Sequence, residues 1–221
     1  THENADFRIS DIKYGNGSHF TLNYNNGKIG NYSIEQVGLH NVLNATAALV
    51  TAYLLHLDMK SAGMGVKSFA GVERRFELRH QLNNILFYDD YAHHPTEINA
   101  TLTAVKTLFP DRRVVAIFQP HLYTRTRDFA EGFASSLQHA DKVYIADIYP
   151  AREKPIHGIN SKILVKMMKE SGYENVRYAG KLKDVHKAVL PDIRENDIVM
   201  TIGAGDIWQV SDTIYKELDE S

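Results

Sequence analysis

From about residue 79 to its end, the chain alternates short apolar runs with stretches of helical periodicity, and this alternation constrains the fold most strongly. The strand-like runs are residues 85–88, 114–118, 143–146, 176–178 and 198–202, and the helical stretches are residues 95–109, 126–139, 161–171, 182–190 and 206–218. Strands that alternate with helices of this length are joined by right-handed crossovers into a mostly parallel sheet. We therefore predict an α/β fold for residues 79–221, with helices on both faces of the sheet.

The first 78 residues have a different pattern. Residues 1–37 alternate apolar and polar side chains around the turns Gly15-Asn16-Gly17 and Asn25-Asn26-Gly27, which predicts short antiparallel β-hairpins. A strongly apolar helix is expected at residues 41–57, with so broad an apolar stripe that it should be well buried. Residues 58–78 contain three glycines and are expected to be a connector. We therefore expect two domains, residues 1–78 and 79–221.

The composition excludes several classes of protein. Lys plus Arg number 25 and Asp plus Glu 27, and no basic stripe is interleaved with aromatic residues, which argues against a nucleic-acid partner. No apolar run approaches the ~20 residues that span a bilayer, so no membrane partner is expected. The absence of cysteine excludes disulfides and fits a reducing cytoplasm. The eleven histidines lack HExxH or similar spacing, so we expect no metal site in this chain.

The loop after the first strand of the alternating region is unusually rich in reactive side chains. Residues 89–97 run Asp-Asp-Tyr-Ala-His-His-Pro-Thr-Glu, and Pro95 suits the first turn of the following helix. In open α/β sheets, ligands bind at the carboxyl ends of the strands, and the start of a helix favours anions. One Asp or His there would be explained as a local cap. Five such residues in one loop favour a binding or catalytic site.

Two further loops follow strands of the same region. Residues 119–127 run Gln-Pro-His-Leu-Tyr-Thr-Arg-Thr-Arg, in which Thr124 or Thr126 could cap the next helix. Arg125 and Arg127 could bind carboxylate or phosphate, although plain surface charge would explain them equally well without the neighbouring loop. The Gly-Ala-Gly-Asp segment at 203–206 lacks the third glycine of a dinucleotide-binding turn, so we predict a tight strand-to-helix connection.

Polar residues also mark the first part of the chain. Asn41 and Asn44 are three residues apart and share a helix face, where a carboxamide can pair with the N6 and N7 edge of adenine. A role as helix N-cap would explain Asn41 but not Asn44. The segment Gly-Val-Glu-Arg-Arg-Phe at 71–76 places Arg74 and Arg75 at the domain junction, where ion pairing between domains is the simpler alternative.

Taken together, residues 38–48, 71–76, 89–97 and 118–126 resemble, in this order, the motifs of the ATP-dependent Mur ligases of peptidoglycan synthesis. Within that family, the chain is most similar to the branch that adds L-alanine to UDP-N-acetylmuramate. The resemblance implies a cytoplasmic enzyme of three domains, with ATP and Mg²⁺ held by the central domain and a Rossmann-like C-terminal domain. It implies an acyl phosphate on the muramyl carboxylate, which the amine of L-alanine attacks with release of ADP and phosphate.

The resemblance also implies roles for individual residues. His40, Asn41 and Asn44 are expected to bind adenine, and Asp90 is expected to contact the ribose. Arg75 is expected to contact the γ-phosphate of ATP, with Arg74 as the alternative. The residues expected to bind the substrate are Tyr91, His93, His94, His121 and Arg125. Arg75, Asp90 and His93 are the expected catalytic residues. Two positions depart from the family, because Ala92 replaces a common glycine and Leu122 a common arginine.

The sequence lacks a GxxxxGK[ST] loop and a uridine-binding first domain, and it begins with Thr1 rather than Met. We therefore expect a piece of a longer protein: a hairpin-and-helix remnant of the central domain, then the whole C-terminal domain. The magnesium ligands would lie in the missing part, and the chain alone should not catalyse ligation. A murein tripeptide ligase shares the Asp-Asp-x-Ala-His-His-Pro loop and is the nearest alternative, although residues 119–126 favour the alanine-adding enzyme. A stand-alone nucleotide-binding module is the alternative outside enzymes.

Overall fold

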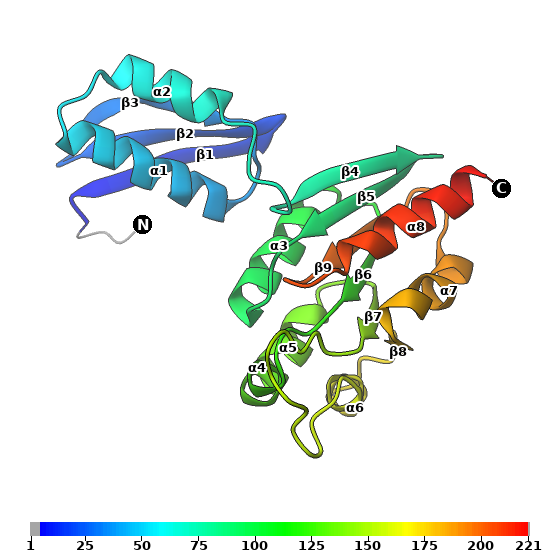
Figure 1. The fold of residues 1–221 in the computed structure, drawn as a ribbon. Coiled ribbons are helices and arrows are strands. Elements are labelled where there is room, and N and C mark those ends of the chain that lie inside the picture. The colour runs from blue at the N-terminus through cyan, green and yellow to red at the C-terminus, as the bar shows by residue number, and fades with distance from the viewer. Residues whose placement is uncertain (1–4, 221) are drawn as a thin grey trace. The chain divides into compact units, whose positions relative to one another are not determined.

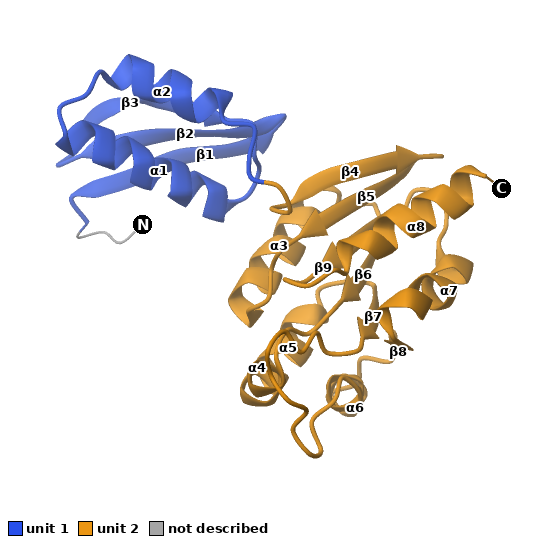
Figure 2. Cartoon of the chain, in the orientation of Figure 1, with its two compact units in different colours: residues 1–72 blue, residues 73–221 orange. Residues whose placement is uncertain are grey.

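The computed structural model describes residues 5–220, and the chain divides into two compact units, residues 1–72 and 73–221 (Figure 2). The division falls between Val72 and Glu73, a few residues before the expected boundary after residue 78. Glu77 and Leu78 lie in the second unit because they pair with a neighbouring strand of its sheet. Each unit has a hydrophobic core of its own.

Unit 1 is a small sheet covered on one face by two helices. Its strands, β1 (Phe7–Gly15), β2 (Gly17–Tyr24) and β3 (Gly27–Ile34), form an antiparallel sheet in the order β1-β2-β3 (Figure 1). Asn25 and Asn26 join β2 to β3 with φ angles of 42° and 67°, as a tight hairpin turn requires. The helices are α1 (Leu39–Leu54) and α2 (Met59–Ser68). The predicted antiparallel hairpins are confirmed.

The expected connector at residues 58–78 is wrong, because residues 59–68 form α2. The Asp58 carboxylate caps this helix by accepting a hydrogen bond from the Ser61 amide at 2.8 Å. The glycines suggested irregular structure, but Gly63 serves packing instead. A Cβ atom there would lie 3.1 Å from the ring of Tyr32, so glycine lets β3 and α2 approach closely.

The expectation that the first helix is well buried is also wrong. It runs over Leu39–Leu54 rather than residues 41–57, and its buried side chains are Val42, Leu49 and Ala52. Leu54, at the end of the apolar stripe, is 61% exposed. Within the described residues, unit 1 offers this helix one sheet face and α2, and these partners cover part of the stripe.

Unit 2 is a six-stranded sheet in the order β4-β5-β9-β6-β7-β8 (Figure 1). The strands are β4 (Glu77–Leu82), β5 (Ile85–Asp90), β6 (Val114–Phe118), β7 (Lys142–Ala146), β8 (Val176–Gly180) and β9 (Ile198–Ile202). All neighbours are parallel except β4, which pairs antiparallel with β5 at the edge. Strands β5 to β9 match the five predicted runs, and β4 was not predicted.

Helices cover both faces of this sheet. They are α3 (Pro95–Leu108), α4 (Tyr123–Asp128), α5 (Ala130–Leu137), α6 (Lys162–Glu170), α7 (Val185–Val189) and α8 (Trp208–Asp219). Ile98, Phe133 and Leu164 bring α3, α5 and α6 into one core, while Val185 and Val210 bring α7 and α8 into the core on the other face. The predicted α/β fold with a mostly parallel, doubly covered sheet is therefore confirmed. The single helix expected at 126–139 is two helices that meet at Phe129.

The strand order brings four carboxyl ends together. β9 lies between β5 and β6, so Asp90 is in register with Ile202, Ile202 with Phe118, and Phe118 with Ile145. The loops that leave β5, β9, β6 and β7 therefore start from one row along one edge of the sheet. This is the edge at which open α/β sheets bind ligands.

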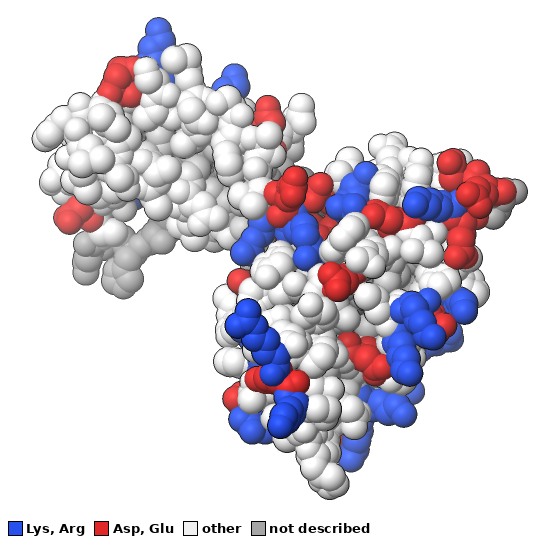
Figure 3. Space-filling view, viewed as in Figure 1, with Lys and Arg blue, Asp and Glu red and all other residues white. Residues whose placement is uncertain are grey.

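The surface of unit 2 carries charges of both signs. Figure 3 shows side chains of both signs on the visible face of unit 2, with Asp and Glu gathered at the upper right and Lys and Arg along the right side below them. No helix in the described part of the chain is long and apolar enough to cross a membrane.

Candidate functional site

Asp89 and Asp90 end β5 and are buried, rather than lying in the loop as expected. Asp90 is 4% exposed, and both of its oxygens accept backbone hydrogen bonds: Oδ1 from Ala92 at 2.8 Å and Oδ2 from Phe76 at 2.9 Å. Burial raises the pKa of Asp90 to about 6, although these hydrogen bonds oppose the shift. Asp90 thus ties the turn at residues 74–76 to the loop after β5.

Asp89 holds the partly buried side chain of Arg74 in unit 2. The Asp89 carboxylate accepts hydrogen bonds from Arg74 Nε at 2.8 Å and from Thr201 Oγ1 at 2.6 Å. Arg74 Nη2 also donates to the Gly203 carbonyl at 2.7 Å. Burial raises the pKa of Asp89, while Thr201 and Arg74 act in the opposite direction. Arg74 therefore neutralises a buried carboxylate and links three segments of the chain.

The neighbouring Arg75 is placed differently. Its side chain is 50% exposed, its guanidinium lies 5.6 Å from the centre of the Tyr91 ring, and Nη1 is 4.0 Å from Glu97. An exposed ion pair at this distance constrains a side chain little. The sequence left both arginines as candidates for a phosphate contact. The guanidinium of Arg74 also lies close to the Tyr91 ring, at 5.1 Å, but it is bonded to Asp89 and Gly203. Arg75 is the one that presents its guanidinium at the surface.

His94 begins α3, and Pro95 occupies the first turn as predicted. His94 Nδ1 accepts the Thr96 amide at 3.3 Å, while Glu97 accepts the amides of His93 at 2.9 Å and His94 at 3.1 Å. Burial tends to raise the pKa of Glu97, but these amides and the nearby positive charges outweigh it and lower the pKa. The capping arrangement fixes the loop and engages the ring of His94.

His93 keeps one ring nitrogen available. Its Nδ1 lies 2.9 Å from the carbonyl oxygen of Tyr91, which can only accept a hydrogen bond. The proton of the neutral ring is therefore assigned to Nδ1, which leaves the Nε2 lone pair as an acceptor. The ring contacts Tyr91 at 5.3 Å and His121 at 6.0 Å between centres, so the loops after β5 and β6 meet at this pair of histidines.

The loop after β6 presents His121 and Arg125 beside His93. Arg125 Nη1 lies 3.4 Å from His121 Nδ1, and burial followed by the charge of Arg125 lowers the pKa of His121. Neither threonine caps α4, contrary to expectation. Leu122 is the N-cap residue, and the Thr126 hydroxyl is turned back to the Leu122 carbonyl at 2.8 Å.

Two residues that sequence reasoning missed complete this region, Tyr149 and Glu153. The Tyr149 ring stacks on His121 at 5.6 Å, and Glu153 accepts a hydrogen bond from the Thr124 amide at 3.0 Å. Both belong to the loop after β7, whose start lies in the same row of strand ends. Their position after β7 could have identified them in the sequence, because polar residues that follow a parallel strand are candidates for a binding site.

The Gly-Ala-Gly segment after β9 packs against the same loops. A Cβ atom at Gly205 would lie 2.5 Å from Gln119 Oε1 and 2.8 Å from the Tyr149 ring, so only glycine fits without a shift. Gly203 has a φ angle of 148°, which also favours glycine. These contacts agree with the predicted tight strand-to-helix connection.

The predicted adenine-binding residues lie in unit 1, in the first turns of α1. Gly38 is the N-cap residue, so the alternative role of Asn41 as N-cap is wrong. The side-chain amide of Asn41 (Nδ2) instead donates to the Val37 carbonyl at 3.0 Å, and Asn44 is exposed one turn later on the same face. His40 lies beside them in the helix.

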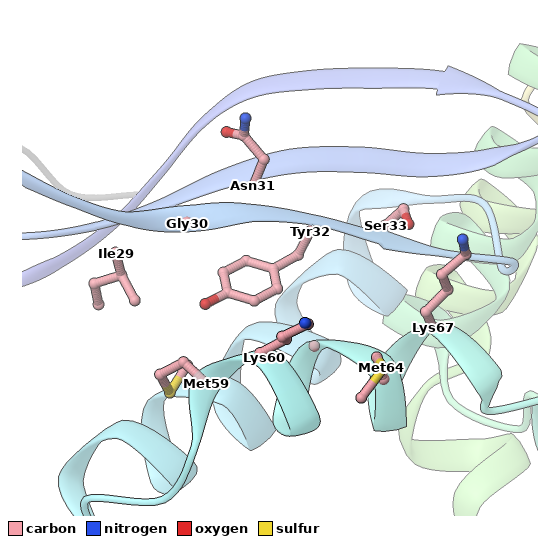
Figure 4. A pocket seen from close by; sticks show the side chains of 10 residues that line it. Ile29, Gly30, Asn31, Tyr32, Ser33, Met59, Lys60, Met64 and Lys67 are labelled. Atoms are coloured by element: carbon pink, nitrogen blue, oxygen red, sulfur yellow. The ribbon is translucent and has the colours of Figure 1, made fainter.

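Two cavities in the described part of the chain lie away from these residues. One, of about 370 Å³, lies between β3 and α2, where Tyr32 sits between the two elements and Lys60 and Lys67 stand at its rim (Figure 4). The other, of about 510 Å³, is lined by charged residues such as Arg113 and Asp192, near the starts of β6 and β7. Within residues 5–220, no group of three His, Cys, Asp or Glu side chains could hold a metal ion.

Comparisons with known proteins agree with this architecture. The family model described as "Mur ligase, glutamate ligase domain" matches residues 74–205. The UDP-N-acetylmuramate–L-alanine ligase of Geotalea uraniireducens (strain Rf4) is 41% identical over 97% of this chain and 47% of its own length. That of Cytophaga hutchinsonii is 41% identical over 92% of this chain and 42% of its own length. The chain thus spans about half the length of the curated relatives it matches.

Several solved structures are similar over nearly the whole chain, and two of them share about a quarter of its residues. The UDP-N-acetylmuramate-alanine ligase of Thermotoga maritima has a TM-score of 0.84 and 26% identity, covering 99% of this chain and 47% of that one. A murein peptide ligase of Psychrobacter arcticus 273-4 has a TM-score of 0.71 and 25% identity, covering 99% of this chain and 45% of that one.

Proposed function

The chain belongs to the Mur ligase family, and on that basis we propose that it is part of an ATP-dependent ligase that joins L-alanine to UDP-N-acetylmuramate. One observation carries the proposal beyond the family. Arg75, His93, His121 and Arg125 gather at the carboxyl edge of the sheet in unit 2, while Arg74 and Asp89 beside them are bonded internally. This edge offers positive charge and imidazole nitrogens to an anionic substrate.

In the proposed reaction, ATP supplies a phosphoryl group that activates the muramyl carboxylate, and the amine of L-alanine then displaces phosphate to form the amide. Such reactions depend on positioning and on neutralising phosphate charge. Arg75 is half exposed beside Tyr91, which suits a contact with the transferring phosphoryl group. His93 has its Nε2 lone pair available to accept a proton from the attacking amine.

The remaining residues are proposed to bind and orient. His121 and Arg125 would hold the anionic muramyl substrate, and Tyr91 and His94 would shape the loop that faces it. His40, Asn41 and Asn44 would contact adenine. Asp90 was expected to reach the ribose, but both of its oxygens are engaged within unit 2, which supports a positioning role through Phe76 and the adjacent Arg75.

The residues of this chain suit ATP better than they suit Mg²⁺. Arg75 presents a guanidinium at the surface of unit 2, which suits the phosphates of ATP, whereas the described residues contain no cluster of metal-ligand side chains. On the basis of the family, we propose that the Mg²⁺ ligands and the GxxxxGK[ST] loop belong to the rest of the ligase. ATP and UDP-sugars are cytoplasmic metabolites, so the proposed place of action is the cytoplasm.

A substrate comparison tests the proposal. A full-length ligase containing this chain, given ATP and UDP-N-acetylmuramate, should consume L-alanine at least on the order of 100-fold faster than murein tripeptide, because a site shaped for one amine rejects a much larger one. Product is measured by mass spectrometry. The 221-residue chain alone is the control and should give none. Faster use of the tripeptide would contradict the proposal and favour a murein peptide ligase, the similar structure with a TM-score of 0.71.

A further inference from the structure

We infer that Glu153 is a positioning residue for Arg125 and His121. Glu153 lies in the neighbouring loop after β7, and its carboxylate caps α4, the helix that carries Arg125. The inference rests on the proposed function for the identity of the anion that Arg125 and His121 bind. The capping itself rests on contacts within unit 2.

The helix α4 has no cap from its own sequence. Its N-cap residue is Leu122, whose side chain cannot accept a hydrogen bond, and the first amides of a helix have no partner within the helix. Glu153 supplies the missing acceptor. Its Oε2 accepts the Thr124 amide at 3.0 Å, its Oε1 accepts the Thr124 hydroxyl, and the Tyr123 amide also donates to the carboxylate. These bonds lower the pKa of Glu153, so the cap is charged at neutral pH.

The backbone reinforces the connection between the two loops. Leu122 N donates to the Tyr149 carbonyl at 2.9 Å, and Tyr149 N donates to the Pro120 carbonyl at 2.8 Å. Leu122 has a φ angle of 68°, an unfavourable conformation for a residue with a side chain. The strained turn is held because the loop after β7 bonds to it on both sides.

The position of Arg125 depends on this turn. α4 has six residues, so its direction is set by its first turn, and Arg125 lies one turn after His121. The groups that face His121 are Arg125, His93, Glu153 and the Tyr149 ring, among which Glu153 alone carries negative charge. Loss of Glu153 should therefore loosen Arg125, and it also removes the nearby negative charge that raises the pKa of His121.

Kinetics of the full-length ligase test the inference. Glu153→Gln should raise KM for UDP-N-acetylmuramate roughly tenfold, the size expected when one charge-assisted hydrogen bond is weakened. KM for ATP and kcat should stay within about twofold, because Glu153 acts through the substrate-binding side chain. In an Arg125→Ala background, Glu153→Gln should add less than about twofold, since the guanidinium it positions is gone. Asp128→Asn is the matched control, an exposed carboxylate on α4 that pairs with Arg127.

Two outcomes of the kinetics would overturn the inference. A full effect of Glu153→Gln in the Arg125→Ala background would show that Glu153 acts independently of Arg125. An equal rise in KM for ATP would show a general loss of structure rather than positioning of one substrate contact.

A measurement on the 221-residue chain separates this inference from the proposed function. By NMR, Glu153→Gln should lower the titration midpoint of His121, and Glu153→Ala should speed hydrogen exchange at the Thr124 amide. Unchanged values of both would overturn the inference even if the ligase is active. If the wild-type ligase fails to use L-alanine while both values shift, the proposed function fails and the capping role stands.

Discussion

Arg75→Ala should lower kcat of the full-length ligase on the order of 10²–10³-fold, with little change in its thermal stability, because the lost guanidinium would stabilise charge on the transferring phosphoryl group. Arg75 is half exposed, and its ion contact with Glu97 is 4.0 Å long. Exposed pairs of this kind contribute little to folding. Steady-state kinetics and thermal unfolding on one preparation measure the two effects. Arg75→Lys, which keeps the charge but not the planar fork, should retain part of the rate.

Arg74→Ala should have the opposite effects: it should lower the stability of the ligase and change kcat little. It leaves the buried carboxylate of Asp89 with the Thr201 hydroxyl but without the arginine that is bonded to it, which costs about 3–5 kcal/mol of unfolding free energy. If Arg74→Ala were as stable as the wild type and slow, while Arg75→Ala turned over normally, the roles of the two arginines would be reversed.

Asp90→Asn should change how the stability of unit 2 depends on pH. Burial raises the pKa of Asp90 from 3.8 to about 6, so between these values the folded chain holds a proton that the unfolded chain has released. The contribution of Asp90 to the unfolding free energy is therefore greatest below about pH 4 and falls by about 3 kcal/mol as the pH rises through 6. In Asp90→Asn this fall should be absent.

Denaturant unfolding of the 221-residue chain at pH 4 to 7 measures the difference. Trp208, the single tryptophan, lies in α8 and reports on unit 2 by its fluorescence. Asp128→Asn is the control, because Asp128 is exposed and its pKa is lowered by the hydrogen bond from Arg127, so it should leave the slope over this range unchanged. Parallel profiles for wild type and Asp90→Asn would contradict the assignment of a raised pKa to Asp90.

Local periodicity was sufficient to predict most of unit 2. Five of its strands are continuous apolar runs between helical stretches, which is the pattern of a buried parallel sheet. The place of β9 between β5 and β6 could not be predicted, since it depends on pairing between residues about a hundred positions apart. The helix α2 was missed because glycine usually interrupts helices, whereas Gly63 makes room for Tyr32.

Contacts between residues far apart in the sequence also explain what could not be predicted about the site. Asp89 and Asp90 looked like loop residues because buried carboxylates are rare, and the partners that make burial tolerable, Arg74, Thr201 and the Phe76 amide, come from other segments. Which of Arg74 and Arg75 contacts the phosphate could not be predicted, because the two residues are identical and adjacent in the sequence. Glu153 was missed because the amide it caps lies 29 residues earlier in the chain. The ligand contacts assigned from the family resemblance stay predictions.

An isotope-transfer measurement tests the proposed ligase activity most directly. UDP-N-acetylmuramate labelled with ¹⁸O in its carboxylate is incubated with ATP, L-alanine and the full-length ligase, and the phosphate is analysed by mass spectrometry. If the carboxylate is activated by the phosphoryl group of ATP and then attacked by the amine, the released phosphate should carry a labelled oxygen and the new amide should retain the other. Unlabelled phosphate, or label found in AMP, would contradict the account.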